Sequence, residues 1–226
     1  YAKLDSMPRM MAFDPEGNLF VTSAKSNRVI MLSDKNHDGI AEAPALITED
    51  LNAPHGLAFI GNTLLVANQN GVVKLSKKDD AWSTPEPFIS NLATGGHTLK
   101  TIKIGPDNHI YLNVGSSCNV CNESDPTRAT ILRYTAEGKP AGALAVVDRH
   151  TSLPPIWAKG LRNSQGFAWH PTTKEMFATN NGADMRSDRK NGPVNDALPP
   201  EHINKIMPGA HYGWPHCWGN LNNAHS

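Results

Sequence analysis

The sequence predicts an all-β protein: a β-propeller built from four-stranded blades. The first observation is a hairpin pattern that occurs four times, in which an apolar strand, a turn rich in Gly, Pro, Asp or Asn, and a second apolar strand follow one another. The second is the spacing of the repeats, because equivalent apolar residues at Phe13, Phe59, Ile104 and Trp169 are 46, 45 and 65 positions apart. Intervals of about 40–50 residues are typical of propeller blades.

The four hairpins occupy residues 10–21, 55–66, 99–112 and 165–178. Further apolar segments predict third strands at 28–32, 72–75 and 129–134, and weaker fourth strands at 45–48, 87–89 and 143–147. The long third interval predicts an insertion between Gly115 and Pro155. No segment keeps the 3.6-residue period of a helix through these turns. The alternative fold, a β-sandwich, would not explain the regular spacing.

The repeats account for nearly all of the 226 residues, so we expect a single propeller domain over residues 1–226. The chain stops in a loop at residues 219–226, and we therefore expect this domain to be incomplete at its C-terminus. The chain opens with Tyr1 rather than methionine, which is typical of a processed or trimmed product.

Composition argues against two classes of function. The chain has 21 Lys and Arg residues against 21 Asp and Glu residues, so it lacks the basic footprint of a nucleic-acid-binding protein. No apolar run reaches the length of a membrane-spanning helix. Three cysteines are also too few for a disulfide-rich scaffold.

His97 is the first candidate for chemistry. Gly95 and Gly96 precede it directly, and predicted strands at 100–104 and 110–114 follow it. Paired glycines allow a sharp turn and let a ligand approach the backbone closely. The sequence therefore favours a functional histidine where a sheet ends; the alternative is a histidine on a surface loop.

A loop at residues 34–42 offers oxygen ligands at alternate positions. Asp34, Asn36 and Asp38 precede a glycine, and Glu42 follows it. This pattern suits a hard cation such as calcium. An EF-hand would need a carboxylate at the twelfth position, where Ala45 stands. The alternative is an Asx-rich surface turn between blade strands.

Cys118 and Cys121 form a C-x-x-C motif at the start of the predicted insertion. Such a pair can bind metal, undergo redox cycling or close a small disulfide. A zinc site would want a second pair of ligands, and the only other cysteine in the sequence is Cys217. We favour a local disulfide.

Two further loops are candidates for ligand binding. Arg162 and Asn163 lie in a glycine-flanked loop before a predicted strand and offer fixed donors to a planar, oxygen-rich ligand. Tyr212 and Trp214 flank Gly213 and give a stiff wall on which a ring could stack. The alternatives are an arginine that binds blade carbonyls and aromatic packing between blades.

Five motifs in this order resemble one family, the soluble pyrroloquinoline-quinone (PQQ)-dependent sugar dehydrogenases, including the sorbosone dehydrogenase-like and aldose dehydrogenase-like members. They are the His97 loop with residues 104–111, and then residues 114–121, 160–166, 180–184 and 209–215. The family fold is a six-bladed propeller, so the resemblance implies that this chain, apparently truncated at its C-terminus, holds about four of the blades.

The resemblance also assigns roles. His97 would be the general base that takes the proton of the substrate hydroxyl, and Arg162 would stabilise negative charge on the quinone oxygen. Four residues would contact or border the PQQ cofactor: Asn163, Asn119, Tyr212 and Trp214. The carbonyls of Gly182 and Ala183 would hold a calcium ion. One departure lies near this ion, because Glu201-His202 stands where an Asp-Glu pair is expected.

The activity implied is that of a quinoprotein oxidoreductase that transfers hydride from an aldose, a sugar aldehyde or a related alcohol to PQQ. The resemblance implies a periplasmic or secreted protein with calcium as second cofactor, and with neither a nucleic-acid nor a membrane partner. An open set of blades predicts a homo-oligomer or a second chain that completes the ring, and weak or absent quinone binding by this chain alone. The alternatives are a calcium-dependent propeller lactonase and a non-catalytic propeller fragment that binds a partner.

Overall fold

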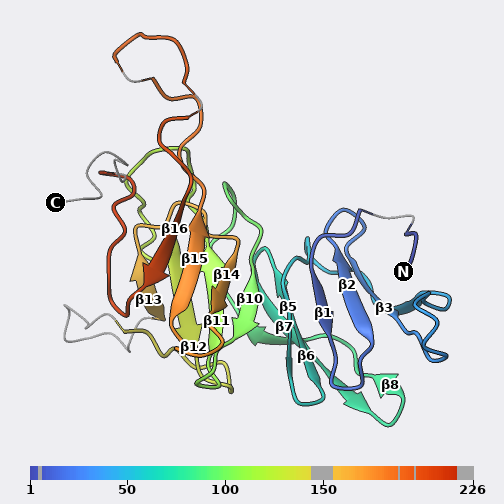
Figure 1. Cartoon of the computed structure of the whole chain (residues 1–226). Helices are drawn as coiled ribbons and strands as arrows, with labels where there is room; N and C mark the ends of the chain where they lie inside the picture. Colours follow the sequence, from blue (N-terminus) through green and yellow to red (C-terminus); the bar gives the residue numbers. More distant parts are fainter. Residues whose placement is uncertain (5–6, 144–154, 188, 196, 218–226) are drawn as a thin grey trace. The chain divides into compact units, whose positions relative to one another are not determined.

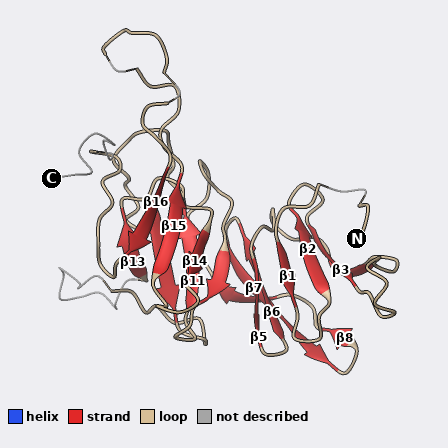
Figure 2. Cartoon of the chain, in the orientation of Figure 1, coloured by secondary structure: helices blue, strands red, loops and turns tan. Residues whose placement is uncertain are grey.

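The computed structural model describes residues 1–4, 7–143, 155–187, 189–195 and 197–217, and these residues form strands and loops without a helix (Figure 2). No helix long and apolar enough to cross a membrane occurs among them. In chain order the strands are β1 (Met11–Phe13), β2 (Leu19–Ser23), β3 (Arg28–Leu32), β4 (Ala45–Thr48), β5 (Leu57–Ile60), β6 (Thr63–Asn68), β7 (Gly71–Lys78), β8 (Ala81–Trp82), β9 (Glu86–Ile89), β10 (Ile102–Ile104), β11 (Ile110–Val114), β12 (Thr130–Tyr134), β13 (Ile156–Lys159), β14 (Phe167–Trp169), β15 (Met176–Asn180) and β16 (His202–Ile206).

These strands form four sheets, each made of strands that follow one another in the sequence (Figure 1). The orders are β1-β2-β3-β4, then β5-β6-β7 with both β8 and β9 on β7, then β10-β11-β12-β13, and finally β14-β15-β16. Up-and-down antiparallel order is the pattern of a propeller blade. The prediction of an all-β propeller with four-stranded blades is therefore confirmed, although β16 is the last described strand of its sheet.

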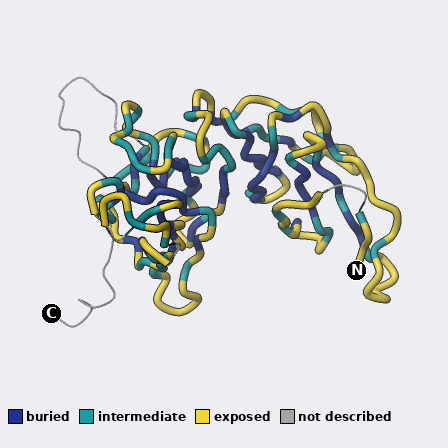
Figure 3. Tube along the Cα trace, turned by 90° about the horizontal axis from the view of Figure 1, so that it is seen from above, coloured by how far each residue is buried: buried dark blue, intermediate teal, exposed yellow. Residues whose placement is uncertain are grey.

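The chain divides into two compact units: Tyr1–Leu92 with Leu99–Ile110, and Ala93–Thr98 with Tyr111–Ser226. Each has its own core. In the first unit Phe20 packs edge-to-face on Phe59 and Trp82, with ring centroids 5.1 and 5.4 Å away. In the second, Tyr111 packs in the same way on Trp157 and Trp169, at 5.6 and 4.9 Å. Figure 3 shows buried residues gathered along the strands and exposed residues along the loops. The single-domain interpretation remains a prediction.

The turn chemistry explains why the hairpins form where the sequence predicts them. In the first hairpin, the Asp14 carboxylate accepts the N–H groups of Glu16 and Asn18 at 2.9 and 2.8 Å. Such Asx contacts satisfy turn amides that have no partner strand. The predicted strands at 28–32 and 45–48 coincide with β3 and β4.

One predicted strand lies almost entirely outside the described residues. Residues 143–147 were expected to form the fourth strand of the third blade, but Ala143 lies in a bend and residues 144–147 fall outside the described part of the chain. The fourth strand is β13, whose Ile156 and Ala158 point into the core while Trp157 and Lys159 are more exposed. The Ala143 N–H donates to the Ile156 carbonyl at 2.9 Å, so this residue leads up to the sheet without belonging to a strand.

Candidate functional site

The Gly95-Gly96 turn sets the position of His97 within the second unit. Both glycines have positive φ, 81° and 60°, as the sequence predicts for a sharp turn. A Cβ on Gly96 would lie 2.5 Å from the Ser116 carbonyl oxygen, and one on Gly115 would lie 2.4 Å from the His97 Cβ. The histidine loop therefore packs backbone to backbone against the segment that follows β11, which only glycine permits at these two positions.

Ser116 fixes the tautomer of His97. The His97 Nδ1 lies 2.9 Å from the Ser116 Oγ and 3.1 Å from the Ser116 carbonyl oxygen. The Ser116 hydroxyl donates its own proton to the Cys118 carbonyl at 2.7 Å, and a carbonyl oxygen can only accept. This network assigns the ring proton to Nδ1, so the Nε2 of the neutral ring carries the lone pair that a general base needs.

Charge and burial keep His97 neutral. Burial lowers the pKa of His97 first, and the positive charge of Arg162 lowers it further. The Ser116 carbonyl, Asp184 and Glu123 act in the opposite direction but do not offset these effects. An imidazole with a depressed pKa is available as a base near neutral pH.

Arg162 is buried, with a side chain that is 3% exposed, and its guanidinium makes four hydrogen bonds. Its Nε donates to the Asn119 carbonyl and its Nη2 to the Asn119 Oδ1, each at 3.0 Å. The same Nη2 lies 2.7 Å from the Asp184 Oδ2, and Nη1 lies 3.4 Å from the Asn181 carbonyl. Its own carbonyl accepts the Ser116 N–H at 2.8 Å. Arg162 and His97 therefore both hydrogen-bond to Ser116, Arg162 through its backbone carbonyl and His97 through its Nδ1.

Asn119 lies in the loop that Cys118 and Cys121 close. The predicted disulfide between these cysteines is confirmed, with Cα atoms 6.2 Å apart. The Asn119 Nδ2 donates to the Asp184 carbonyl at 2.8 Å, and the Trp214 Nε1 donates to the Asn119 carbonyl at 3.2 Å. Asn119 thus links Arg162 to two other predicted motifs, while its outer side remains exposed.

Asn163 has a fixed backbone and a side chain that ends in a buried oxygen. Its backbone is fixed, since its N–H donates to the Asn180 Oδ1 at 3.3 Å and its carbonyl accepts the Asn181 N–H at 3.1 Å. Among the residues that the structure describes, its buried side-chain Oδ1 has no hydrogen-bond partner, and neither has the buried Ser164 Oγ beside it. The Oδ1 lies 3.2 Å from where a Gly115 Cβ would be, on the side of His97. Buried polar atoms without partners need an explanation, and a bound ligand is one.

Four predicted residues share a small cavity of about 10 Å³, which offers space on the scale of one water molecule. Its walls are Asn180, Gly182, Ala183, Pro199, Pro200, His202, Tyr212, Trp214 and Cys217. The Gly182 N–H donates to the Glu201 carboxylate at 2.9 Å. The Tyr212 hydroxyl accepts the Met207 N–H and donates to the Lys205 carbonyl, both at 2.7 Å. Tyr212 therefore stabilises the end of β16, and the cavity is too small for a tricyclic quinone.

The acidic loop at 34–42 lies in the first unit and satisfies its own oxygens. The Asp34 carboxylate accepts the N–H groups of Asp38 and Gly39 at 3.1 and 3.0 Å, and Glu42 accepts that of Lys35 at 2.9 Å. The Asn36 Nδ2 donates to the Asp38 Oδ2 at 2.9 Å. These contacts are those of an Asx-rich turn. Calcium binding by this loop remains a prediction.

Across the part of the chain that the structure describes, one cluster of three His, Cys, Asp or Glu ligand atoms is close enough to share an ion. It consists of Cys118, Cys121 and Glu123. Because the two cysteines are joined in a disulfide, they have no thiolate to offer a metal.

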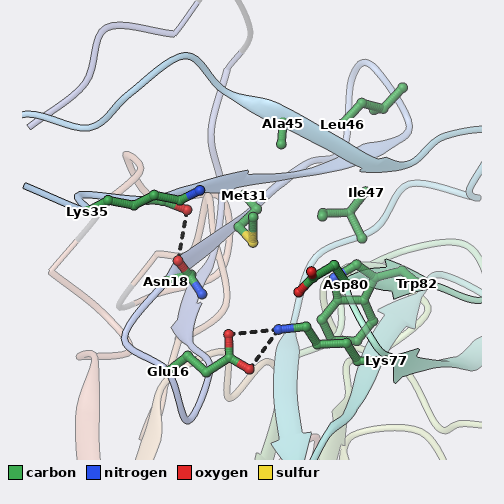
Figure 4. A pocket seen from close by; sticks show the side chains of 11 residues that line it. Glu16, Asn18, Met31, Lys35, Ala45, Leu46, Ile47, Lys77, Asp80 and Trp82 are labelled. Carbon is green, nitrogen blue, oxygen red and sulfur yellow. Dashed lines mark hydrogen bonds and ion pairs between the residues drawn. The ribbon is translucent and has the colours of Figure 1, made fainter.

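A separate open pocket of about 630 Å³ lies in the first unit (Figure 4). Its walls include Met31, Ile47 and Trp82, and the Lys77 ammonium bonds both oxygens of the Glu16 carboxylate there at 2.7 Å. None of the residues predicted from the sequence to carry chemistry lines this pocket.

Ser116 and Asp184 are the site residues to which sequence reasoning gave no role. Both stand inside quoted motifs, 114–121 and 180–184. Their partners lie 19 and 22 positions away, at His97 and Arg162, and such pairings leave no local pattern in a single sequence.

Comparison with known proteins finds one matching family and several solved structures with the same fold. Residues 2–225 match the family described as TrAA12-like. A calcium structure of Trichoderma reesei carbohydrate-active enzyme family AA12 has the same fold, with a TM-score of 0.79 and 23% identity over 99% of this chain and 59% of that one. The PQQ-bound aldose sugar dehydrogenase of Streptomyces coelicolor has a TM-score of 0.73 and 20% identity over 99% of this chain and 66% of that one.

A curated relative, an uncharacterised protein of Borreliella burgdorferi, is 23% identical over 94% of this chain and 52% of its own length. The chain thus spans between 52% and 66% of these three proteins. The family match and the two structures confirm the resemblance found in the sequence.

Proposed function

Because the chain belongs to the TrAA12-like family, we propose that it is a quinoprotein oxidoreductase that oxidises an aldose, a sugar aldehyde or a related alcohol with PQQ as its cofactor. One observation carries the proposal: a neutral histidine and a buried arginine are both fixed on Ser116, beside a buried asparagine oxygen without a partner. The pair offers a base and a positive charge within one site.

The residues present fit PQQ by the chemistry of their donors. The guanidinium of Arg162 and the polar ends of Asn163 and Ser164 suit the oxygens and ring nitrogens of a planar quinone. PQQ, when bound, supplies the acceptor for hydride. Because the cavity that Trp214 and Tyr212 line is too small for PQQ, these residues would border the cofactor from outside that cavity, and Asn119 would face it from its exposed side.

In this proposal His97 accepts the proton of the substrate hydroxyl at Nε2, since Ser116 keeps Nδ1 protonated. Arg162 holds positive charge where negative charge develops, and its four acceptors prevent it from turning away. Both groups are in place before the substrate arrives, so little reorganisation is needed.

Calcium is the second proposed cofactor. The carbonyls of Gly182 and Ala183 are hard oxygen donors of the kind calcium prefers, and the Glu201 carboxylate lies beside them, against the Gly182 N–H. A calcium ion there would polarise a bound quinone. The disulfide fits the proposed periplasmic or secreted location, because such bonds persist in oxidising compartments.

The test is reconstitution of the chain with PQQ and calcium, followed by aldose-dependent reduction of an electron-accepting dye. We expect dye reduction that requires both PQQ and an aldose, and none with the sugar lactone. Hydrolysis of a lactone in calcium alone, without dye reduction, would instead support the lactonase alternative. PQQ that binds without dye reduction by any aldose, sugar aldehyde or related alcohol would contradict the quinoprotein proposal.

A further inference from the structure

The four-residue loop from Cys118 to Cys121 carries an asparagine that contacts the site with three polar groups. The Asn119 carbonyl accepts from the Arg162 Nε and the Trp214 Nε1. Its Oδ1 accepts from the Arg162 Nη2 and the Asp184 N–H, and its Nδ2 donates to the Asp184 carbonyl. We propose that Asn119 is a positioning residue for Arg162, and that the Cys118–Cys121 disulfide holds Asn119 in the conformation that this role requires.

Asn119 is the anchor that Arg162 depends on most. It provides two of the four acceptors of the guanidinium, one at Nε and one at Nη2, and two such contacts fix the plane of the group. The Asp184 carboxylate is 75% exposed, and ion pairs to exposed partners contribute little. The Asn181 carbonyl is more distant, at 3.4 Å. Without the Asn119 side chain, Nη2 would keep only the exposed Asp184 carboxylate, and the backbone carbonyl that still accepts from Nε would no longer be held in place by the bonds of the amide to Asp184.

The disulfide holds Asn119 from both sides in the chain, since the two half-cystines are Cys118 before it and Cys121 after it. On the same loop the Cys118 carbonyl accepts the Ser116 hydroxyl at 2.7 Å. Closing so short a loop limits the conformations available to the residues between its ends. Reduction by a dithiol breaks the S–S bond, forms two cysteine thiols and oxidises the reagent to its disulfide, and it would release Asn119 and with it Arg162.

The pKa of His97 can be measured without PQQ, and it reports on the position of Arg162. The charged groups that act on His97 are Arg162, which opposes its protonation, and Asp184 and Glu123, which favour it. If Arg162 moves away, the pKa of His97 rises. The Ser117 N–H and hydroxyl bond the Glu123 carboxylate at 2.6 and 2.7 Å, so Glu123 has contacts that do not involve Asn119.

The experiment titrates the His97 ring by NMR in the complete chain without PQQ, with its signals assigned from a His97→Gln variant. Asn119→Ala and the Cys118→Ser, Cys121→Ser double variant should each raise the pKa of His97. Arg162→Gln should raise it as well, and Asn119→Ala added to Arg162→Gln should raise it no further, because the two residues act as one unit. Asn122→Ala is the matched control: this exposed neighbour makes none of the contacts above, and its variant should titrate like the parent.

Dithiothreitol gives a second route if a substituted chain fails to fold. It should raise the pKa of His97 in the parent and leave the double serine variant unchanged. With PQQ and calcium, Asn119→Ala should lower kcat by up to ~100-fold with little change in the KM for sugar, since it misplaces a group that acts on the transition state. This kinetic part rests on the proposed function, whereas the titration does not.

A His97 pKa that is unchanged in Asn119→Ala and in the reduced parent would overturn the positioning role. An equal shift in Asn122→Ala would also overturn it, because the effect would then come from general loosening of the loop. PQQ binding without activity in the parent, together with the expected shift in pKa, would leave Asn119 in its role and refute the dehydrogenase proposal instead.

Discussion

At the scale of single residues, the contacts of the His97 Nδ1 decide that the Nε2 is the atom that can act as a base. Ser116 engages the His97 Nδ1 through both its hydroxyl and its carbonyl, so the ring can present only Nε2 as an acceptor. Arg162 adds a positive charge that disfavours the imidazolium. In the proposed reaction, the same arrangement that keeps the base neutral would place a cation where the quinone gains negative charge.

His97→Ala removes this base. In the enzyme loaded with PQQ and calcium, we expect kcat to fall by about 10²–10⁴-fold, the usual contribution of general base catalysis. Binding of PQQ and calcium, measured by equilibrium titration, should persist, because the hydrogen bonds of the imidazole to the described residues are made through Nδ1 and anchor the His97 loop rather than the cofactors. Turnover near that of the parent would show that another group takes the proton.

Ser116→Ala tests the tautomer assignment. The backbone carbonyl of residue 116 would still accept from Nδ1, so the loss is that of one hydrogen bond, and kcat/KM should fall by about 2–10-fold.

The pH profile of kcat/KM tests the lowered pKa of His97. Because burial and Arg162 lower the pKa of His97, the acidic limb should lie below the usual histidine range, and Arg162→Gln should move it to higher pH. A limb that Arg162→Gln leaves in place would contradict this account.

At the scale of elements, the hairpins were predictable because their signals are local. Strand alternation and turns such as the one that begins at Asp14 lie within a dozen residues of one another. β13 and β16 lacked such signals. β13 pairs with β12 across the long insertion, and β16 buries only Ile206 while Ile203 is 72% exposed. Both depend on tertiary pairing that a single sequence does not display.

The Gly-Gly turn can be tested by adding one methyl group. Gly96→Ala would place a Cβ within 2.6 Å of three backbone atoms of Ser116 and Ser117, at a positive φ. Backbone strain of this kind costs about 1–3 kcal/mol, and the clash adds to it. Denaturant unfolding should show this loss of stability, whereas Gly17→Ala, at positive φ but in open space, should lose less. Equal losses would indicate that φ alone matters.

The disulfide prediction can be checked by chemistry. Free-thiol labelling under denaturing conditions should modify Cys217 alone, because this residue is the free cysteine and is exposed. After reduction, Cys118 and Cys121 should become labelled too. Three labelled thiols without reduction, or a bridge from either residue to Cys217, would contradict the pairing.

At the scale of the whole molecule, the repeat predicted the fold but not the hydrogen bonds that assemble the site. The Trp214 side chain reaches the Asn119 carbonyl across 95 positions, and Asn119 reaches Asp184 across 65. Motif order placed these residues in one family pattern, yet their contacts depend on how blades bring loops together. For that reason Asn119 was predicted as a cofactor ligand, and its contact with Arg162 became visible only in three dimensions.

Calcium binding can be located by its effect on the stability of the whole chain. A ligand that binds only the folded state stabilises it by about 2.7 kcal/mol at 100 times its Kd, so calcium with PQQ should raise the Tm, and a chelator should reverse the rise. Two sequence motifs are candidate calcium sites, the loop at 34–42 and the carbonyls of Gly182 and Ala183. In the loop at 34–42 the carboxylates of Asp34 and Asp38 already accept backbone N–H groups. We therefore expect Asp34→Ala with Asp38→Ala to keep the calcium-dependent rise.

Glu201→Gln, beside Gly182, should weaken that rise, because it removes a carboxylate that lies beside the proposed carbonyl ligands. Differential scanning calorimetry of the parent and both variants, with and without calcium, separates the two sites. A rise that disappears in the Asp34 and Asp38 variant but survives in Glu201→Gln would place calcium in the acidic loop. The ion would then lie in the first unit, whereas Arg162 and His97 lie in the second, and its role would be structural.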